Sequence, residues 1–158
     1  MALLDLLKFC RELPARRNKA ALLLTPDLRE QRACAAQIAG AAGATHFDVL
    51  DAFQVDGTLS ERFASFSSVE FFALVAAQKA EPLLIVSGLE FLLAAWLSQD
   101  DQNEVKRRFC HQIEMWEGRH KQPFLLVTHR DPVFAAYTPA RFTDGPLVIK
   151  LSQTLSFS

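Results

Sequence analysis

The stretch Leu83-Leu84-Ile85-Val86-Ser87-Gly88-Leu89-Glu90 decides the fold of this chain. Four apolar residues follow Pro82 and stop abruptly at Ser87-Gly88, a pattern typical of a buried central strand whose tip opens directly into a helix. In open α/β sheets, ligands bind beyond the carboxyl ends of the parallel strands. The residue types at this tip and at neighbouring tips therefore indicate which chemistry the chain could perform.

Similar apolar runs recur along the sequence, separated by segments whose apolar residues have helical spacing. We expect strands over 20–24, 45–50, 83–86, 124–127 and 146–151. Residues 51–66 are expected to form a loop of mixed character, and 98–101 to break two helices. This alternation predicts an α/β fold: a three-layer sandwich around a five-stranded, mostly parallel sheet with right-handed crossovers.

The composition favours one compact domain over residues 1–158. Half of the 158 residues are hydrophobic and 13 are phenylalanines, enough to fill a core. A helix and a basic connector are expected over 1–19, followed by the α/β core over 20–151. We interpret the connector, which contains Arg16 and Lys19, as a solvated linker.

Charge and cysteine content narrow the classes of function. The formal net charge of −1 gives no global reason to bind nucleic acid or an anionic membrane. Cys10, Cys34 and Cys110 lie far apart without CxxC spacing, which predicts reduced, mostly buried thiols, no metal site and a cytoplasmic location. The most apolar window, 83–97, is shorter than the roughly 20 residues that span a bilayer, so no membrane segment is expected.

The succession of elements resembles the core of P-loop NTPases of the AAA+ or RecA-like kind, over roughly residues 20 to 151. In that family the first strand leads into the phosphate loop, the third carries the Walker B acids, the fourth ends in a polar sensor, and an arginine precedes the fifth. The corresponding places are Thr25 to Arg32, Ser87 to Glu90, Thr128 and Arg141. The segment that begins Arg141-Phe142 is similar to the arginine-phenylalanine box before the last AAA+ strand.

The chain departs from this family at both nucleotide motifs. A phosphate loop needs glycines and a lysine, but residues 25–32 contain neither, and Gln31 stands near the expected place of the lysine. Pro26 lacks an amide donor, and Ser87-Gly88 stand where a magnesium-binding carboxylate belongs. The resemblance therefore implies degenerate Walker motifs without bound ATP or magnesium, and we expect no C-terminal lid domain.

Several residues at the strand tips are candidates for a site, each with a structural alternative. The catalytic candidates are Glu90, Thr128 and Arg141, and the weak cofactor-binding candidates are Thr25, Arg29 and Ser87. Glu90 is more economically a capping-box partner of Ser87, and Arg141 is either an arginine finger or a surface residue. We favour an ordinary strand-to-helix turn capped by Asp131 for 128–131. A hydrolase triad of Ser87, His129 and Asp131 is disfavoured because the glycines of GxSxG are missing.

Two further features bear on partners. The basic clusters 106–108 and 119–121 could attract nucleic acid, but interleaved glutamates favour a solvated helix face. The apolar residues of 89–97 wrap around more than one helical face, which predicts contact with a partner protein or a second copy.

These observations favour a catalytically degenerate P-loop-like subunit or adaptor of a larger assembly, with a partner ATPase as its neighbour. The chain is similar to the BrxF family, the small P-loop-like component of bacterial BREX phage-defence systems, which implies indirect association with DNA. The alternative is an ATPase with an unorthodox phosphate site, built from the strand-tip residues Thr25, Arg29, Ser87, Glu90 and Thr128. A third hypothesis is a nucleic-acid-binding protein that uses the face over 106–121.

Overall fold

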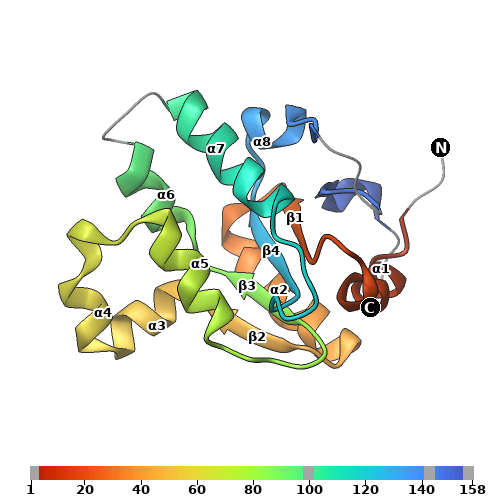
Figure 1. Ribbon diagram of the computed structural model, residues 1–158, viewed down its shortest axis with the longest axis horizontal. Helices are drawn as coiled ribbons and strands as arrows, with labels where there is room; N and C mark the ends of the chain where they lie inside the picture. Colours follow the sequence, from red (N-terminus) through yellow and green to blue (C-terminus); the bar gives the residue numbers. More distant parts are fainter. Residues whose placement is uncertain (1–3, 98–101, 141–144, 155–158) are drawn as a thin grey trace.

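A computed structural model describes residues 4–97, 102–140 and 145–154 of the chain. Its centre is a five-stranded sheet in the order β2-β3-β4-β1-β5, with every neighbouring pair parallel (Figure 1). The strands are β1 (Ala20–Thr25), β2 (Thr45–Asp48), β3 (Leu84–Ser87), β4 (Phe124–His129) and β5 (Val148–Lys150). The predicted α/β class and five-stranded parallel sheet are confirmed.

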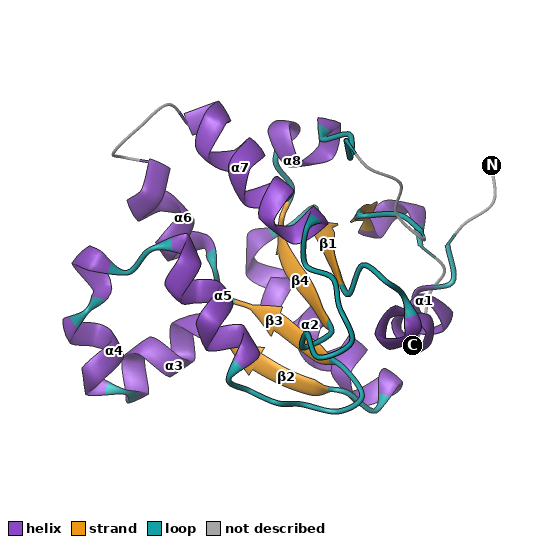
Figure 2. Ribbon diagram, in the orientation of Figure 1, coloured by secondary structure: helices purple, strands orange, loops and turns teal. Residues whose placement is uncertain are grey.

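Helices cover both faces of this sheet, because the side chains of its inner strands are apolar and buried on both faces (Figure 2). On one face lie α1 (Leu6–Glu12), a 3₁₀ turn (Leu13–Ala15) and α2 (Gln31–Ala42), which a second 3₁₀ turn (Leu28–Glu30) precedes. On the other lie α3 (Val49–Val55), α4 (Gly57–Glu61), a 3₁₀ turn (Phe63–Ser65), α5 (Ser68–Ala76), α6 (Glu90–Leu97), α7 (Gln102–Glu114) and α8 (Pro132–Ala136). A last 3₁₀ turn, Leu151–Gln153, follows β5.

The register of the parallel sheet brings the carboxyl ends of its strands to one edge. Thr25 at the end of β1 pairs with His129 at the end of β4, and Ser87 at the end of β3 pairs with Asp48 at the end of β2. Since β3 and β4 are also neighbours, the tips of β1, β3 and β4 lie side by side. The residues that follow these strands can therefore contact one another.

The expectation of a loop over 51–66 is wrong, because α3, α4 and a 3₁₀ turn occupy most of this segment. Side chains supply the helix starts: Asp48 accepts a hydrogen bond from the Asp51 amide, and Asp56 accepts from the amides of the first turn of α4. Val49 and Phe53, one helical turn apart, are buried in the core. Helices this short contain too few apolar residues for a helical period to be recognised in the sequence, and their caps are single side chains.

The interpretation of the basic connector as a solvated linker holds for the exposed Arg11 and Arg17 but is wrong for Arg16 and Lys19. Arg16 is 8% exposed and Lys19 is 9% exposed. The Arg16 guanidinium lies over the ring of Phe9, 5.2 Å from its centroid, and donates to the Asn18 side chain. The long apolar stems of both residues permit this burial while their charged ends find hydrogen-bond acceptors.

The apolar surplus of α6 is largely buried within the chain. Leu89, Leu92 and Leu93 lie in the core, and the indole N–H of Trp96 donates to the carbonyl of Phe66. The predicted helix break at 98–101, and the residues Arg141 and Phe142, lie outside the described residues. Among the described helices, none has the length and apolar character needed to cross a bilayer.

Candidate functional site

The candidate site lies beyond the carboxyl ends of β1, β3 and β4, where α2 and α6 begin. Its centre is the carboxylate of Glu90, the first residue of α6. Glu90 Oε1 accepts hydrogen bonds from Thr128 Oγ1 at 2.8 Å and from the His129 backbone amide at 3.1 Å. The side-chain amide of Gln31, at the start of α2, donates to the same oxygen. One carboxylate oxygen therefore joins β4, α2 and α6.

Gln31 closes this network on the side of β3. Its side-chain carbonyl accepts a hydrogen bond of 3.0 Å from the backbone amide of Gly88, while its amide group binds Glu90. The residue is 3% exposed, so both ends of its side chain are satisfied inside the protein. The sequence indicated Gln31 only as the residue near the expected place of a lysine, and its role in this network was not predicted. A polar residue at the start of the alanine-rich helix α2 was the available signal.

Thr25 and Ser87 are buried beneath this network, 1% and 0% exposed. Thr25 Oγ1 donates to the carbonyl of Thr128 at 3.3 Å, and the Thr25 carbonyl accepts from the Arg130 amide at 2.8 Å. These bonds tie β1 to β4 at the point where both strands end. The Ser87 hydroxyl instead lies 2.8 Å from Nε2 of His46, on the edge strand β2.

Gly88 is held in a conformation that only glycine adopts easily, with φ +76°. A Cβ atom at this position would lie 3.0 Å from the Leu50 amide nitrogen and 3.2 Å from Asp48 Cγ. Asp48 also caps α3 and pairs with Arg32 Nε at 2.9 Å. The close approach of β2 and β3 at their tips thus depends on the absence of a side chain at Gly88.

Burial lowers the pKa of His46, and the nearby Arg32 guanidinium lowers it further, against the opposing effect of Asp48. The imidazole is therefore neutral at neutral pH. Its hydrogen bond with Ser87 joins the edge strand to the centre of the sheet. No described set of three His, Cys, Asp or Glu residues is arranged to hold a metal ion.

The remaining predicted candidates do not join the network. Arg29 is exposed, and within the described residues its side chain makes no hydrogen bond or ion pair with the strand-tip groups. The capping-box interpretation of Glu90 with Ser87 is wrong, because Glu90 begins α6 and bonds α2 and β4, while Ser87 bonds His46. Arg141 lies outside the described residues.

The turn after β4 has the predicted structural role. Asp131 accepts from the amides of Val133 and Phe134 at the start of α8 and pairs with Lys106 Nζ at 2.5 Å. Since Ser87 bonds His46 and Asp131 bonds Lys106, the described contacts do not assemble a triad of Ser87, His129 and Asp131.

Two small cavities flank the network at the strand tips. One, of about 360 Å³, lies toward β2, and its polar lining includes Gln31, Arg32, Asp48 and Glu90. The other, of about 430 Å³, lies toward β5. The cavity toward β2 is lined by three carboxylates and Arg32, whereas the cavity toward β5 carries Arg130 and Lys150 beside Asp131 and Pro26.

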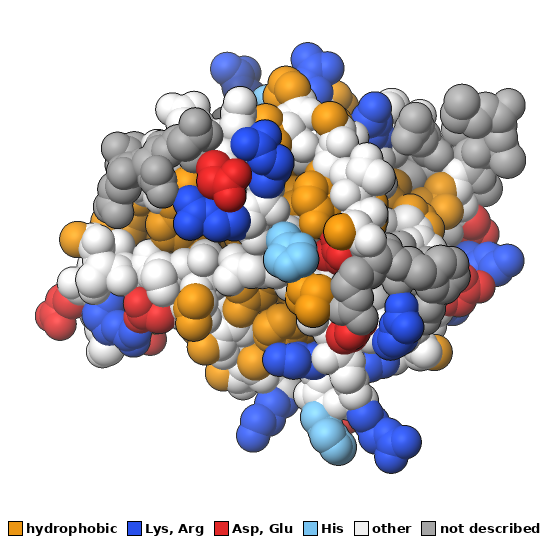
Figure 3. All heavy atoms as spheres, turned by 45° about the horizontal axis from the view of Figure 1, so that its top comes forward, with side chains coloured by type: hydrophobic (Ala, Val, Ile, Leu, Met, Phe, Trp, Pro, Cys, Tyr) orange, Lys and Arg blue, Asp and Glu red, His pale blue; other side chains and the backbone are white. Residues whose placement is uncertain are grey.

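The basic cluster on α7 is largely engaged in ion pairs. Arg107 and Arg108 both pair with Glu104, at 3.5 and 3.7 Å, and Lys106 pairs with Asp131. Figure 3 shows acidic side chains among the basic ones on the face that it presents. The positive charge of this helix is therefore partly offset by neighbouring carboxylates.

Comparisons with known proteins assign no family. No family model and no curated protein matches the chain.

Proposed function

We propose that this chain is a catalytically degenerate P-loop-like subunit or adaptor of a larger assembly, with a partner ATPase as its neighbour. The observation that carries the proposal is the closed hydrogen-bond network of Gln31, Gly88 and Glu90. It fills the place where the family resemblance puts a phosphate and its lysine. The hydrogen-bonding groups of these residues bond one another, so they are not available to a phosphate.

Nucleotide binding at this place would be costly for three reasons. If a phosphate oxygen accepted the hydrogen bond of the Gly88 amide, the buried side-chain carbonyl of Gln31 would lose its donor. This loss would cost about 1–3 kcal/mol of binding free energy. Gln31 carries no positive charge to offset the phosphate. The start of the helical segment is already occupied by Asp27, whose carboxylate accepts from the Arg29 amide at 2.8 Å.

An exposed apolar surface supports the role of a subunit. Among the described residues, the exposed large apolar side chains are those of Leu50, Val55, Phe63, Val69 and Met115. Four of these five fall within 50–69, on α3, α5 and the turn between α4 and α5. Val55 is 79% exposed and Val69 is 68% exposed, values that favour burial against another protein.

The second candidate, an ATPase with an unorthodox site, draws support from one contact. The hydrogen bond between Thr128 and Glu90 joins the places that the P-loop layout gives to a sensor and an acid. The two candidates predict different effects of Glu90→Gln, because a catalytic acid governs turnover whereas a structural acid governs stability.

For the adaptor, we expect isothermal calorimetry of the full chain with magnesium and ATP to give no saturable heat. Glu90→Gln should lower the free energy of unfolding by about 1–3 kcal/mol, because it removes the charge that strengthens three hydrogen bonds. Glu104→Gln is the matched control. It weakens the exposed ion pairs with Arg107 and Arg108 and should change stability by less than about 0.5 kcal/mol. Saturable ATP binding, or turnover abolished by Glu90→Gln, would overturn the proposal in favour of the ATPase.

The assembly itself is tested by purification of the tagged chain from its native cells. We expect a complex that hydrolyses ATP, and loss of this complex when Val55→Asp and Val69→Asp are combined. Both side chains are exposed, so the double variant should retain the fold. A chain that light scattering shows to be a monomer, without co-purifying ATPase activity, would contradict the role of a subunit.

A further inference from the structure

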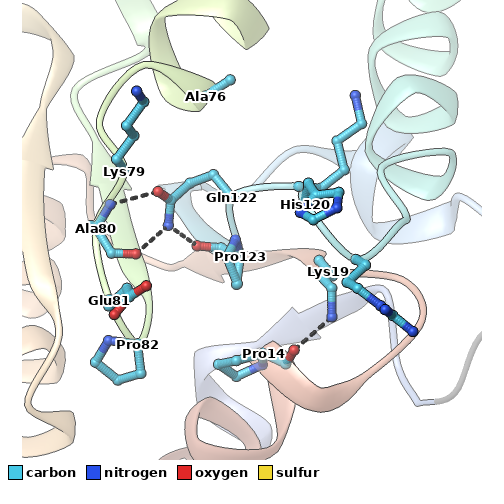
Figure 4. A pocket seen from close by; sticks show the side chains of 12 residues that line it. Pro14, Lys19, Ala76, Lys79, Ala80, Glu81, Pro82, His120, Gln122 and Pro123 are labelled. Atoms are coloured by element: carbon cyan, nitrogen blue, oxygen red, sulfur yellow. Dashed lines mark hydrogen bonds between the residues drawn. The ribbon is translucent and has the colours of Figure 1, made fainter.

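A groove of about 900 Å³ opens at the amino ends of β3 and β4, at the opposite end of the sheet from the strand-tip network. Its walls are the segment between α5 and β3, the segment between α7 and β4, and the residues just before β1 (Figure 4). None of the residues that line the groove belongs to the site above.

The two main walls are fixed to each other by Gln122, which is 6% exposed. Its side chain accepts from the Ala80 amide at 2.6 Å and donates to the Ala80 carbonyl at 2.8 Å, the bonds drawn in Figure 4. The Gln122 carbonyl in turn accepts from the Trp116 indole at 2.8 Å. These hydrogen bonds hold the two walls in a fixed relative position, so the groove is not a gap between two independent loops.

Positive charge dominates the groove. Lys79 stands on one wall and Arg119, His120 and Lys121 on the other, and Glu81 is the sole carboxylate among the described lining residues. In the described part of the chain, Lys79, Arg119 and Lys121 form no ion pair, unlike the basic residues of α7. The groove thus holds cations whose charge no contact in the described structure offsets.

Lys19 adds a buried cation at the floor. Its ammonium is bonded to the carbonyls of Pro14 at 2.6 Å and Arg16 at 2.7 Å, and no described carboxylate pairs with it. A buried ammonium with only neutral acceptors keeps much of its desolvation cost, which an anion nearby would offset. Two of the three donors of the ammonium are used by these carbonyls.

We propose that this groove binds phosphate groups of a polyanionic ligand. The described lining contains no Phe, Tyr or Trp on which a base could stack; its one aromatic ring is the imidazole of His120. Lys121 Nζ covers the neighbouring Trp116 at 4.4 Å from the ring centroid. We therefore expect the groove to contact phosphate groups and to bind without preference for base sequence. The phosphates could belong to a nucleic-acid backbone or to a free inorganic oligophosphate, two sources of one chemistry.

The test uses the full chain and two probes. A labelled DNA single strand of mixed sequence, about 20 nucleotides long, is titrated by fluorescence anisotropy, and inorganic tripolyphosphate by calorimetry, both in about 50 mM salt. If the source is a nucleic-acid backbone, the DNA binds and log K falls with log salt with a slope of about −2, as expected for three phosphate contacts to a single strand. If the source is a free oligophosphate, only the tripolyphosphate binds.

In either case Lys79→Glu combined with Arg119→Glu should weaken binding by about tenfold or more. Arg11→Glu combined with Arg107→Glu makes the same change in net charge on exposed residues that do not line the groove and should leave affinity within about twofold. The proposal is overturned if neither probe binds, or if both double variants weaken binding equally. Circular dichroism of the variants checks that each retains the fold.

Discussion

At the scale of single residues, polar side chains fix the strand tips as firmly as apolar ones fix the core. Glu90, Gln31 and Thr128 are joined by bonds that span three elements, and each would leave a buried partner unsatisfied if truncated. Gly88 has a comparable role through its missing side chain, because its φ of +76° and the nearby Leu50 amide leave no room for a Cβ. The geometry of the site therefore rests on a few positions.

We expect Gly88→Ala to lower the free energy of unfolding by about 2–3 kcal/mol, because alanine would combine a left-handed backbone with a steric overlap. Urea denaturation measures the change. Gly40→Ala is the matched control: Gly40 lies within α2 with no atom near a built Cβ, so alanine should stabilise the protein by about 0.5–1 kcal/mol. Equal effects of the two substitutions would show that Gly88 is not constrained.

At the scale of elements, the segment between β2 and β3 consists of short helices that depend on their caps. The seven-residue α3 and the five-residue α4 are too short to be stable as isolated helices. Asp56 supplies two hydrogen bonds to the first turn of α4, to the amides of Thr58 at 2.9 Å and Leu59 at 3.4 Å. The same segment carries most of the exposed apolar residues that we assign to a partner.

Asp56→Ala should therefore destabilise α4 by about 1 kcal/mol, with Asp56→Asn losing less because asparagine also caps helices well. Hydrogen exchange followed by mass spectrometry should show faster exchange over 57–65, while the amides of β1 and β4 keep their protection. Faster exchange throughout the chain would indicate that the segment unfolds only with the whole domain.

At the scale of the whole molecule, the sheet is buried on both sides, and the three cysteines lie in these buried layers as free thiols. Burial raises the pKa of Cys10 to about 12, despite the opposing effect of Arg11. Burial, with a smaller effect of Asp131, raises the pKa of Cys110 to about 12. The pKa of Tyr137 is also raised, mainly by burial and further by the hydrogen bond of its hydroxyl to Glu114.

These shifts predict an alkaline limit of stability. Between pH 9.0, the ordinary thiol pKa, and about 12, the folded chain keeps protons that the unfolded chain has lost. The free energy of unfolding is therefore unaffected by these thiols below pH 9.0 and falls as the pH rises above it, by up to about 1.4 kcal/mol per pH unit for each thiol.

Urea denaturation from pH 7 to 11 measures this slope. Cys10→Ala and Cys110→Ala should lower stability at neutral pH but make the alkaline slope shallower. Val75→Ala, a buried substitution that removes no titrating group, should lower stability without changing the slope. A slope that the cysteine substitutions leave unchanged would contradict the assignment to the thiols.

The sequence alone determined the number of strands and the positions of the inner strands β1, β3 and β4, because a strand buried on both faces leaves a continuous apolar run. The edge strand expected over 45–50 ends at Asp48, because α3 begins at Val49. It also indicated that Thr25, Ser87, Glu90 and Thr128 follow strands, and parallel strands bring their carboxyl ends to one edge. The short helices over 49–61 escaped detection, since their starts depend on single capping side chains rather than on periodicity.

Only the tertiary structure decided which of these residues meet. Gln31 and Glu90 are 59 residues apart, and the two groove walls joined by Gln122 and Ala80 are 42 residues apart. Such contacts depend on the order of the strands and on the packing of helices between them, which no local pattern specifies. The burial of Lys19 and the conformation of Gly88 likewise follow from what surrounds them, because desolvation and steric exclusion are properties of the assembled fold.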